Sequence, residues 1–457
     1  MKNLFKYAAE HWKALIAIIV ILFIQAYCDL SLPSYTSDIV NVGIQQGGIE
    51  DQIPEAVSAD EMEKLLLFVP TGDQDTVLDA YEEDDSTYDM KAYVLKDSVS
   101  DSAEKKEEIS GILQGPMMLT AGFESGSDMT KQIEEQMKAN MPAQTETGDM
   151  SVFDLLKMLP EEQRAAMLQG MDEQMADLPD TILEQAAVAY VQSAYEELGL
   201  DMDSIQINYL IVTGGKMVGL AFLGMAASIL VGFLASRVGA ATGRDLRSRV
   251  FHKVVGFSNN EFDHFSTASL ITRSTNDIQQ IQLLTVMLLR IVLYAPILAI
   301  GGIIQVFQTN VSMSWIIALA VILIALVILV LFVVAMPKFK ILQNLVDKLN
   351  LVTREILTGL SVIRAFSTQK HEEERFDQAN RDLTRTNLFV NRAMTFMMPV
   401  MMLVMNGISV LIMWNGAHGI SEGQMQVGDM MAFIQYTMQI IMGFLMLCMP
   451  VSYTHLT

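Results

Sequence analysis

The sequence predicts an all-α integral membrane protein with six membrane-spanning helices, long cytoplasmic extensions of those helices, and a mainly helical extracellular insertion between the first two. Three observations predict this architecture. Apolar runs alternate with polar segments, basic residues gather in alternate loops, and one acidic block interrupts the chain. The chain has 457 residues, of which 51% are hydrophobic, yet its formal net charge is −23. These values do not describe one homogeneous domain.

Charge separates the acidic block from the rest of the chain. From Glu50 to Asp203 there are 37 acidic and 9 basic residues, a net charge of −28, so the remainder is slightly basic. An acidic, water-soluble block is therefore inserted into a membrane protein. We divide the chain into 1–46 with the first span, 47–205 as the insertion, 206–450 with the other spans and two cytoplasmic coupling loops, and 451–457.

Six segments are apolar for the roughly 20 residues that a helix needs to cross about 30 Å of hydrocarbon. Their approximate bounds are 14–35, 209–236, 284–307, 314–336, 393–414 and 427–450. The first run is too long for the core of a signal peptide and is interpreted as a retained span. Lysines and arginines precede the first span and fill the loops after spans two and four, whereas loops 308–313 and 415–426 contain none. The positive-inside rule therefore predicts cytoplasmic termini and an extracellular insertion.

The insertion and the two basic loops each carry sequence signals of helices, so we expect all three to be structured. In the insertion, Ser151 is expected to cap one helix and Asp180 or Thr181 another. The first half, with its acidic cluster Glu82–Asp85, is expected to be mixed or loosely ordered. Both basic loops keep the apolar spacing of helices and contain no glycine or proline cluster. We therefore expect the spanning helices to continue into the cytoplasm, where short helices join them.

Three stretches occur in a distinctive order relative to the predicted spans. The first runs from Leu246 to the segment LITRSTNDI at Leu270–Ile278, the second is EILTGLSVIRAFSTQKHEEERFDQAN at Glu355–Asn380, and the third is GQMQVGDMMAFIQY at Gly423–Tyr436. Together they resemble the transmembrane domain of ABC exporters of the multidrug and lipid type. The resemblance covers 14–450 apart from the acidic block. One departure is Ala268-Ser269, where the family commonly has glycine before the first motif.

The resemblance implies that the tips of both cytoplasmic loops dock on an ATPase domain. In the second loop it implies a short transverse helix around Ser361–Thr368, with a bend at Gly359, an apolar anchor at Phe366 and a charged contact at Arg364. In the first loop, Asn260–Phe265 is expected to act in the same way. The candidate coupling residues are Asn260, Phe262, Asp263, Phe265, Gly359, Ser361, Arg364 and Phe366. The alternative is that the aromatic side chains only pack loop helices together.

The machinery for ATP hydrolysis is absent from this sequence. It contains no G-x-x-x-x-G-K-[ST] loop and no L-S-G-G-Q-like signature, and we identify no catalytic residue, metal site or nucleic-acid motif. ATP and Mg are therefore expected on a nucleotide-binding domain that is either a missing C-terminal part or a separate subunit. Val451–Thr457 is interpreted as a sequencing or cloning artefact. By resemblance, a second half-transporter, identical or not, completes the pathway in the lipid bilayer of the cell membrane.

Polar and methionine side chains in the spans are candidates for the substrate pathway, because polar groups at membrane depth are costly. We identify Gln25, Lys216, Arg290, Gln305, Asn406 and Gln435 at that depth, none of them acidic. From these we select Gln25, Asn406 and Gln435, with hydrogen bonding between helices as the alternative. Flexible thioethers suit varied apolar ligands, so Met398, Met402 and Met438 are added, with packing or lipid contact as the alternative.

The expected function is export of hydrophobic or amphipathic small molecules, lipids or peptides by alternating access. Two other classes were considered. A membrane-anchored sensor or adhesion protein would act through the acidic domain, but it would not need long basic helices in the cytoplasm. An ion-driven transporter would need an acidic residue at mid-membrane, and none was identified there.

Overall fold

The computed structural model describes residues 9–84, 87–88, 90–125, 152–175, 178–258, 267–309 and 312–454. The chain forms two compact units. The helical unit comprises Met1–Pro33, Gly219–Asn415 and Phe433–Thr457, and the insertion unit comprises Ser34–Val218 and Gly416–Ala432. Helices dominate the described ranges, which confirms the predicted all-α membrane fold. The four domain boundaries drawn from sequence stay predictions.

Five helices in the described ranges are long and apolar enough to cross a membrane: Trp12–Gln45, Met202–Val255, Ser269–Thr309, Ser314–Thr358 and Gln369–Ser421. Their elements, in chain order, are α2 (Trp12–Asp38), η2 (Ile39–Gln45), α11 (Met202–Val255), α13 (Thr267–Thr272), η3 (Arg273–Asp277), α14 (Ile278–Met287), η4 (Leu288–Val292), α15 (Tyr294–Thr309), α16 (Ser314–Thr358) and α18 (Gln369–Ser421). The short helix η1 (Ala9–His11) precedes the first of them. The sixth predicted span is helix α19 (Val427–Thr454), and its passage through a membrane stays a prediction.

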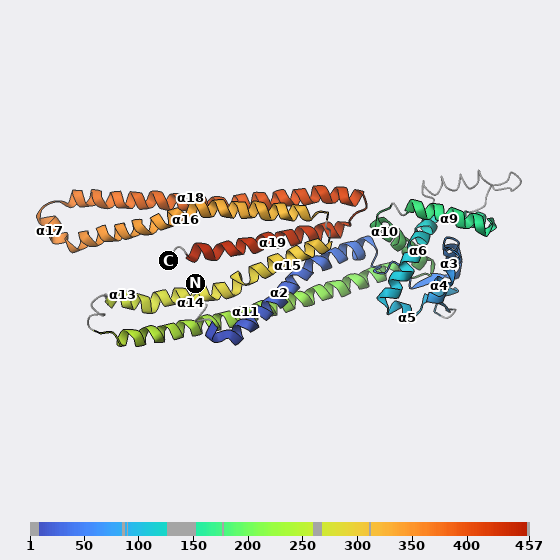
Figure 1. The fold of residues 1–457 in the computed structure, drawn as a ribbon, viewed down its shortest axis with the longest axis horizontal. Coiled ribbons are helices and arrows are strands. Elements are labelled where there is room, and N and C mark those ends of the chain that lie inside the picture. The colour runs from blue at the N-terminus through green and yellow to red at the C-terminus, as the bar shows by residue number, and fades with distance from the viewer. Residues whose placement is uncertain are drawn as a thin grey trace. The chain divides into compact units, whose positions relative to one another are not determined.

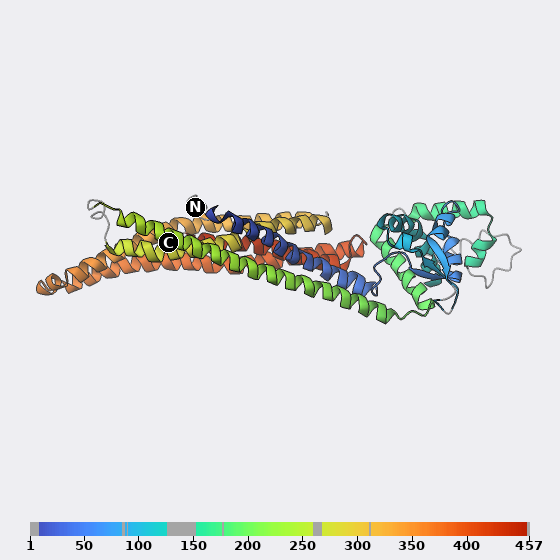
Figure 2. The same cartoon turned by 90° about the horizontal axis from the view of Figure 1, so that it is seen from below.

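The helices extend well beyond the length that a bilayer requires. Helix α16 has 45 residues and α18 has 53, whereas about 20 residues cross the hydrocarbon. The short helix α17 (Leu360–Ala365) joins them at one end, so that the three elements form a long hairpin (Figure 1). Within the helical unit the long helices run alongside one another (Figure 2). The predicted helical extensions and the short helix at their tip are therefore both present.

Most apolar side chains of the long helices face outward. Only 17–33% of the most apolar stretch of each candidate span is buried. Ile322, Leu329 and Val333 on α16 are each more than half exposed. Such exposure is typical of a surface that lipid or another subunit covers, because contact between water and an apolar patch of this extent is unfavourable in free energy.

Packing inside the helical unit is concentrated where helices approach closely. Buried Ile324, Met401 and Ile441 bring α16, α18 and α19 together in one apolar cluster. Glycine permits a close approach of α15 to α19, because a Cβ on Gly302 would lie 2.8 Å from Cγ1 of Ile440. Small residues at such crossings are typical of membrane helix pairs, where close van der Waals contact replaces the hydrophobic effect.

Between η2 and α11, the described ranges of the insertion unit contain seven helices and a small sheet. Its elements are β1 (Ala56–Ser58), α3 (Ala59–Leu66), α4 (Gln74–Ala80), β2 (Tyr81–Asp84), β3 (Ala92–Leu95), α5 (Asp97–Ser100), α6 (Ala103–Ser125), α8 (Val152–Met158), α9 (Glu161–Met175) and α10 (Asp180–Glu197). The strands are antiparallel in the order β1-β3-β2, and Tyr93 pairs with both Val57 and Glu83. The sequence did not predict this sheet, because its strands are three or four residues long and β2 is acidic.

The predicted helix caps of the insertion are only partly tested. The predicted cap at Asp180 or Thr181 is wrong: helix α10 already begins at Asp180, Pro179 occupies the N-cap position, and no side chain caps the helix. The proposed cap at Ser151 lies outside the described residues. Proline is tolerated here because the first backbone N–H groups of a helix have no partner within the helix.

Two apolar clusters hold the insertion unit together. The larger one surrounds Val57, Leu65, Leu113 and Tyr190 and joins the sheet to α3, α6 and α10. The smaller one contains Phe68, whose ring stacks on Phe123 with 5.6 Å between the ring centroids. A domain with its own apolar core is able to hold a defined shape despite a net charge of −28 over its sequence.

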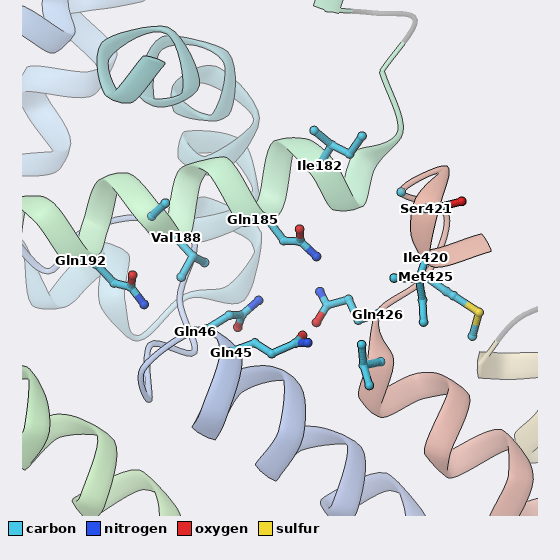
Figure 3. Close-up of a pocket in the computed structure, with 13 residues that line it drawn as sticks. Gln45, Gln46, Ile182, Gln185, Val188, Gln192, Ile420, Ser421, Met425 and Gln426 are labelled. Carbon is cyan, nitrogen blue, oxygen red and sulfur yellow. The ribbon is translucent and has the colours of Figure 1, made fainter. Parts of the chain in front are cut away.

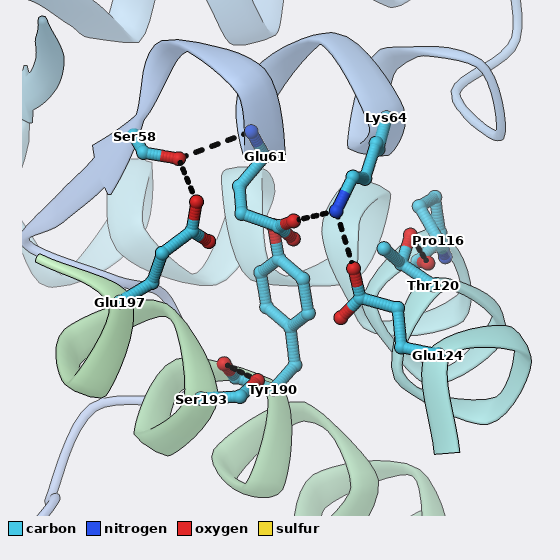
Figure 4. Close-up of polar contacts among 9 residues, drawn as sticks. All are labelled: Ser58, Glu61, Lys64, Pro116, Thr120, Glu124, Tyr190, Ser193 and Glu197. Carbon is cyan, nitrogen blue, oxygen red and sulfur yellow. Dashed lines mark hydrogen bonds and ion pairs between the residues drawn. The ribbon is translucent and has the colours of Figure 1, made fainter.

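A partly buried ionic network lies between α3, α6 and α10 (Figure 4). Ser58 caps α3 by accepting a 3.1 Å hydrogen bond from the Glu61 backbone, and it donates to Glu197 at 3.2 Å. The Glu61 carboxylate pairs with Lys64, which also contacts Glu124 at 2.6 Å. Burial raises the pKa of Glu61 to about 7, although the lysine opposes this shift.

This network predicts that the insertion unit is more stable at mildly acidic pH. A carboxyl group with a raised folded-state pKa stabilises the fold below its unfolded value of 4.5, and this contribution is lost as pH rises through about 7. From pH 6 to pH 8 we expect the opening free energy of α3 to fall by about 1 kcal/mol. Hydrogen exchange of the α3 amides in the full chain, corrected for intrinsic pH dependence, measures this. In Glu61→Gln the dependence should disappear; an unchanged slope in that variant would assign it to another group.

Candidate coupling tip, polar networks and family

The tip of the α16–α18 hairpin is built by a break in the helix at Gly359. Helix α16 ends at Thr358. Gly359, whose backbone angles are φ −91° and ψ 10°, links it to α17. A second break follows Phe366, where Ser367 adopts a positive φ of 53°. Backbone of this kind costs conformational energy in a residue other than glycine, so surrounding structure must hold it. The predicted bend at Gly359 lies at the observed helix end.

Helix α17 presents an exposed surface with an apolar centre. Phe366 is 77% exposed and Val362 is 58% exposed, while Ser361 and Arg364 are also exposed. Phe366 therefore does not pack loop helices together within this chain, which was the alternative interpretation of this side chain. An exposed aromatic side chain next to an arginine is typical of the centre of a protein–protein contact.

Ionic and apolar contacts brace the hairpin behind its tip. Arg375 on α18 contacts Glu355 on α16 with 2.6 Å between the charged atoms, and it also contacts Glu372 at 3.4 Å. Further along, Ala335, Phe339 and Val390 form a small buried cluster between the same helices. The hairpin thereby connects α17 to the apolar part of α16 and α18 through continuous helix. The other predicted tip, with Asn260, Phe262, Asp263 and Phe265, lies outside the described residues.

A second polar network ties the end of α2 to the beginning of α19. We call it the Asp429 network and define it by Ser37, Asn41, Gln426, Gly428 and Asp429. Ser37 and the Asn41 amide donate to Oδ1 of Asp429 at 2.8 and 3.1 Å, and the Gln426 backbone donates to Oδ2 at 3.2 Å. Asn41 in turn accepts a 2.7 Å bond from the Gly428 backbone.

The Asp429 network satisfies groups that helix ends leave without partners. The bond from Gln426 to Asp429 satisfies one backbone donor at the start of α19, and Asn41 satisfies another. Asn41 and Gly428 are buried. Gly428 leaves no room for a side chain, because a Cβ there would lie 2.5 Å from both Asn41 Oδ1 and the Ser37 backbone oxygen. The sequence analysis identified none of these contacts.

An acidic residue within the first span was missed by the sequence analysis. Asp29 lies in α2, and the Tyr294 hydroxyl of α15 donates a hydrogen bond to its carboxylate. Gln439 of α19 donates to the Asp29 backbone oxygen at 2.9 Å, and the predicted pathway residue Gln25 bonds to the Tyr294 hydroxyl. The set of polar residues identified within the spans therefore omitted one acidic residue, Asp29. The signal in the sequence is a single charged residue inside the first apolar run.

The other predicted pathway residues lie on α18 and α19. Asn406 is exposed on α18, and Gln435 and Met438 are half-buried on α19. Met398 and Met402 are exposed on α18, whereas the neighbouring Met397, Met401 and Met405 pack against the cluster of α16 and α19. One methionine face of α18 is thus a packing face, and the other remains open for lipid, a second subunit or a ligand. The assignment of these residues to a pathway stays a prediction.

Comparison with known proteins assigns the helical part of the chain. Residues 188–444 match the model of the ABC transporter transmembrane region. The chain belongs to this family. The match begins within α10 and ends within α19, so it includes the α16–α18 hairpin and the beginning of α19. The family identified from three sequence stretches is confirmed as the ABC transporter transmembrane region, and the long apolar helices agree with a multi-pass membrane protein.

Individual ABC transporters are similar over about half of the chain. An uncharacterized ABC transporter ATP-binding protein of Mycobacterium tuberculosis strain H37Rv is 37% identical over 239 residues, which are 52% of this chain and 41% of the relative. One of Bacillus subtilis strain 168 is 34% identical, with 51% and 41% covered. A mitochondrial iron-sulfur clusters transporter of Neurospora crassa is 24% identical, with 52% and 35% covered. The chain thus spans about two fifths of the length of its matched relatives.

Proposed function

We propose that this ABC transporter membrane region forms half of an ATP-driven exporter in a cell membrane, with both termini and the α17 tip in the cytoplasm. It moves hydrophobic or amphipathic molecules outward by alternating access. ATP and Mg are bound by a nucleotide-binding domain that docks on α17 and on the tip around residues 260–265. A second half-transporter completes the pathway. The names of the Mycobacterium and Bacillus relatives, which describe ATP-binding proteins, support such a partner domain.

The observation that carries this proposal is the exposed tip of the α16–α18 hairpin. A six-residue helix joins the ends of two long helices. Phe366, the residue that follows it, has 77% of its surface exposed. A transporter driven by ATP needs a rigid connection between a distant nucleotide site and the spans, and a continuous helix with braced flanks provides one. The Arg375–Glu355 contact keeps both arms of this connection together.

Direction and energy source are tested together in sealed vesicles. The chain is joined to the ATP-binding portion of the Bacillus relative and reconstituted, and ATP is added only outside. Molecules whose nucleotide side faces outward then carry a fluorescent amphiphile into the lumen if they are exporters. We expect ATP-dependent accumulation that vanadate stops. Depletion of preloaded amphiphile under the same conditions would indicate import, and no ATP-dependent change in either arrangement would contradict the proposal.

Because Asp29 places a carboxyl group within a span, we expect the transporter to prefer cationic amphiphiles over neutral ones. A carboxylate within a span is costly and is retained where it faces a partner or a ligand. In Asp29→Asn the negative charge is lost while a hydrogen-bond acceptor for Tyr294 remains. We expect transport of a cationic amphiphile to fall about tenfold, with little change for a neutral one of equal size. Equal losses for both amphiphiles would assign Asp29 a purely structural role.

A further inference from the structure

The insertion unit contains a cavity of about 480 Å³ between α10, the end of η2 and the segment that joins α18 to α19 (Figure 3). Its lining is rich in carboxamides: Gln45, Gln46, Gln185, Gln192 and Gln426. None of the described residues that line it carries a charge. A cavity of this size is in the range of small-molecule sites.

One lining side chain has a polar atom that the chain does not satisfy. Gln426 is only 9% exposed, and its carboxamide oxygen has no hydrogen-bond partner among the described residues. Figure 3 shows this carboxamide directed toward Gln45 and Gln46 across the cavity. A buried acceptor without a partner destabilises a protein, and solvent does not reach this oxygen. A ligand in the cavity therefore removes this cost only when the Gln426 carboxamide turns toward it. The Asp429 network does not use this side chain, since Gln426 contributes only its backbone N–H.

The chemistry of the lining selects for an uncharged ligand. Glutamine side chains offer one acceptor and two donors each, which match the alternating groups of peptide amides. Anions are disfavoured by the net charge of −28 between Glu50 and Asp203. A cation would lose hydration without finding a carboxylate on the lining.

The rest of the wall favours a peptide over a sugar. Ile182, Val188 and Met425 supply aliphatic and thioether surface. Among the described lining residues there is no aromatic face on which a sugar ring could stack. We propose that this cavity binds an uncharged ligand of amide groups with an aliphatic side chain, such as a short apolar peptide. This site lies outside the proposed transport function, because it needs neither ATP nor a second half-transporter.

The test measures binding of a defined probe to the full chain in lipid nanodiscs without nucleotide. The probe is N-acetyl-alanyl-leucine amide, followed by saturation-transfer NMR. We expect saturable binding with a dissociation constant on the order of 1 mM, as for a ligand of this size. The same dipeptide with a free carboxylate should bind about tenfold more weakly, and methyl glucoside should neither bind nor displace the probe.

Matched variants locate the probe in the cavity. Gln426→Met keeps the length of the side chain and removes the carboxamide. It should raise the dissociation constant of the probe about tenfold. Gln185→Leu tests the opposite wall independently, while Gln163→Leu on the exposed face of α9 should change nothing. The proposal is overturned if the probe gives no saturable signal at concentrations up to about 10 mM. It is also overturned if neither cavity variant weakens binding of the probe, or if methyl glucoside displaces the probe. Because ATP is absent, failure here leaves the export proposal standing.

Discussion

Replacing Phe366 by alanine should reduce ATP-driven transport about thirtyfold without affecting the fold. The side chain is 77% exposed, so its removal takes away little packing within this chain. An aromatic anchor that becomes buried in a partner contributes about 2 kcal/mol or more to docking, which is a factor of about thirty in affinity. The measurement is ATP-dependent accumulation of the amphiphile in the vesicles described above, together with ATPase activity.

A matched control for this prediction is Phe251→Ala. Phe251 is 66% exposed on α11 and lies outside both predicted tips. We expect less than about a twofold change in transport, as for a surface substitution away from a contact. Transport at the wild-type rate in Phe366→Ala would remove the central support for docking at α17. An equal loss in both variants would point to a general effect of exposed phenylalanines on insertion or folding.

Replacing Gly428 by alanine should separate the end of α2 from the beginning of α19. The new Cβ would lie 2.5 Å from the Ser37 backbone oxygen, which has no flexible side chain to move aside. It would also displace Asn41 and remove its bond to the Gly428 backbone. We expect a destabilisation of about 3 kcal/mol. Thermal unfolding in detergent measures the loss, and spin labels at the exposed positions Ile44 and Gln424 should report a longer separation.

The control for the glycine substitution is Gly407→Ala in α18. No atom lies within 4 Å of the Cβ that this substitution adds. Alanine there should leave the label separation unchanged and change stability by no more than about 1 kcal/mol in the favourable direction. If Gly428→Ala behaves like this control, the close contact with Ser37 does not limit the position of α19.

Prediction from sequence succeeded where a local pattern carries the information. The sequence placed a short helix around Ser361–Thr368, and the structure forms it at Leu360–Ala365, directly after the predicted bend at Gly359. Five of the six predicted spans agree with long apolar helices, because hydropathy over about 20 residues is a property of one segment. Prediction failed for the small sheet of the insertion, whose short strands carry little periodic signal.

Amino-acid sequence by itself determined the membrane class, the acidic insertion and the ABC transporter family, since apolar length, charge and motif order are read along the chain. Only the tertiary structure decided which distant residues meet. Asn41 bonds to Gly428 across 387 positions, and the carboxamides of Gln45, Gln185 and Gln426 line one cavity. Hydropathy indicates that a helix is buried or spans a membrane, but it does not indicate which side of the helix faces which neighbour. Those pairings depend on how helices pack, and packing is a property of the whole fold.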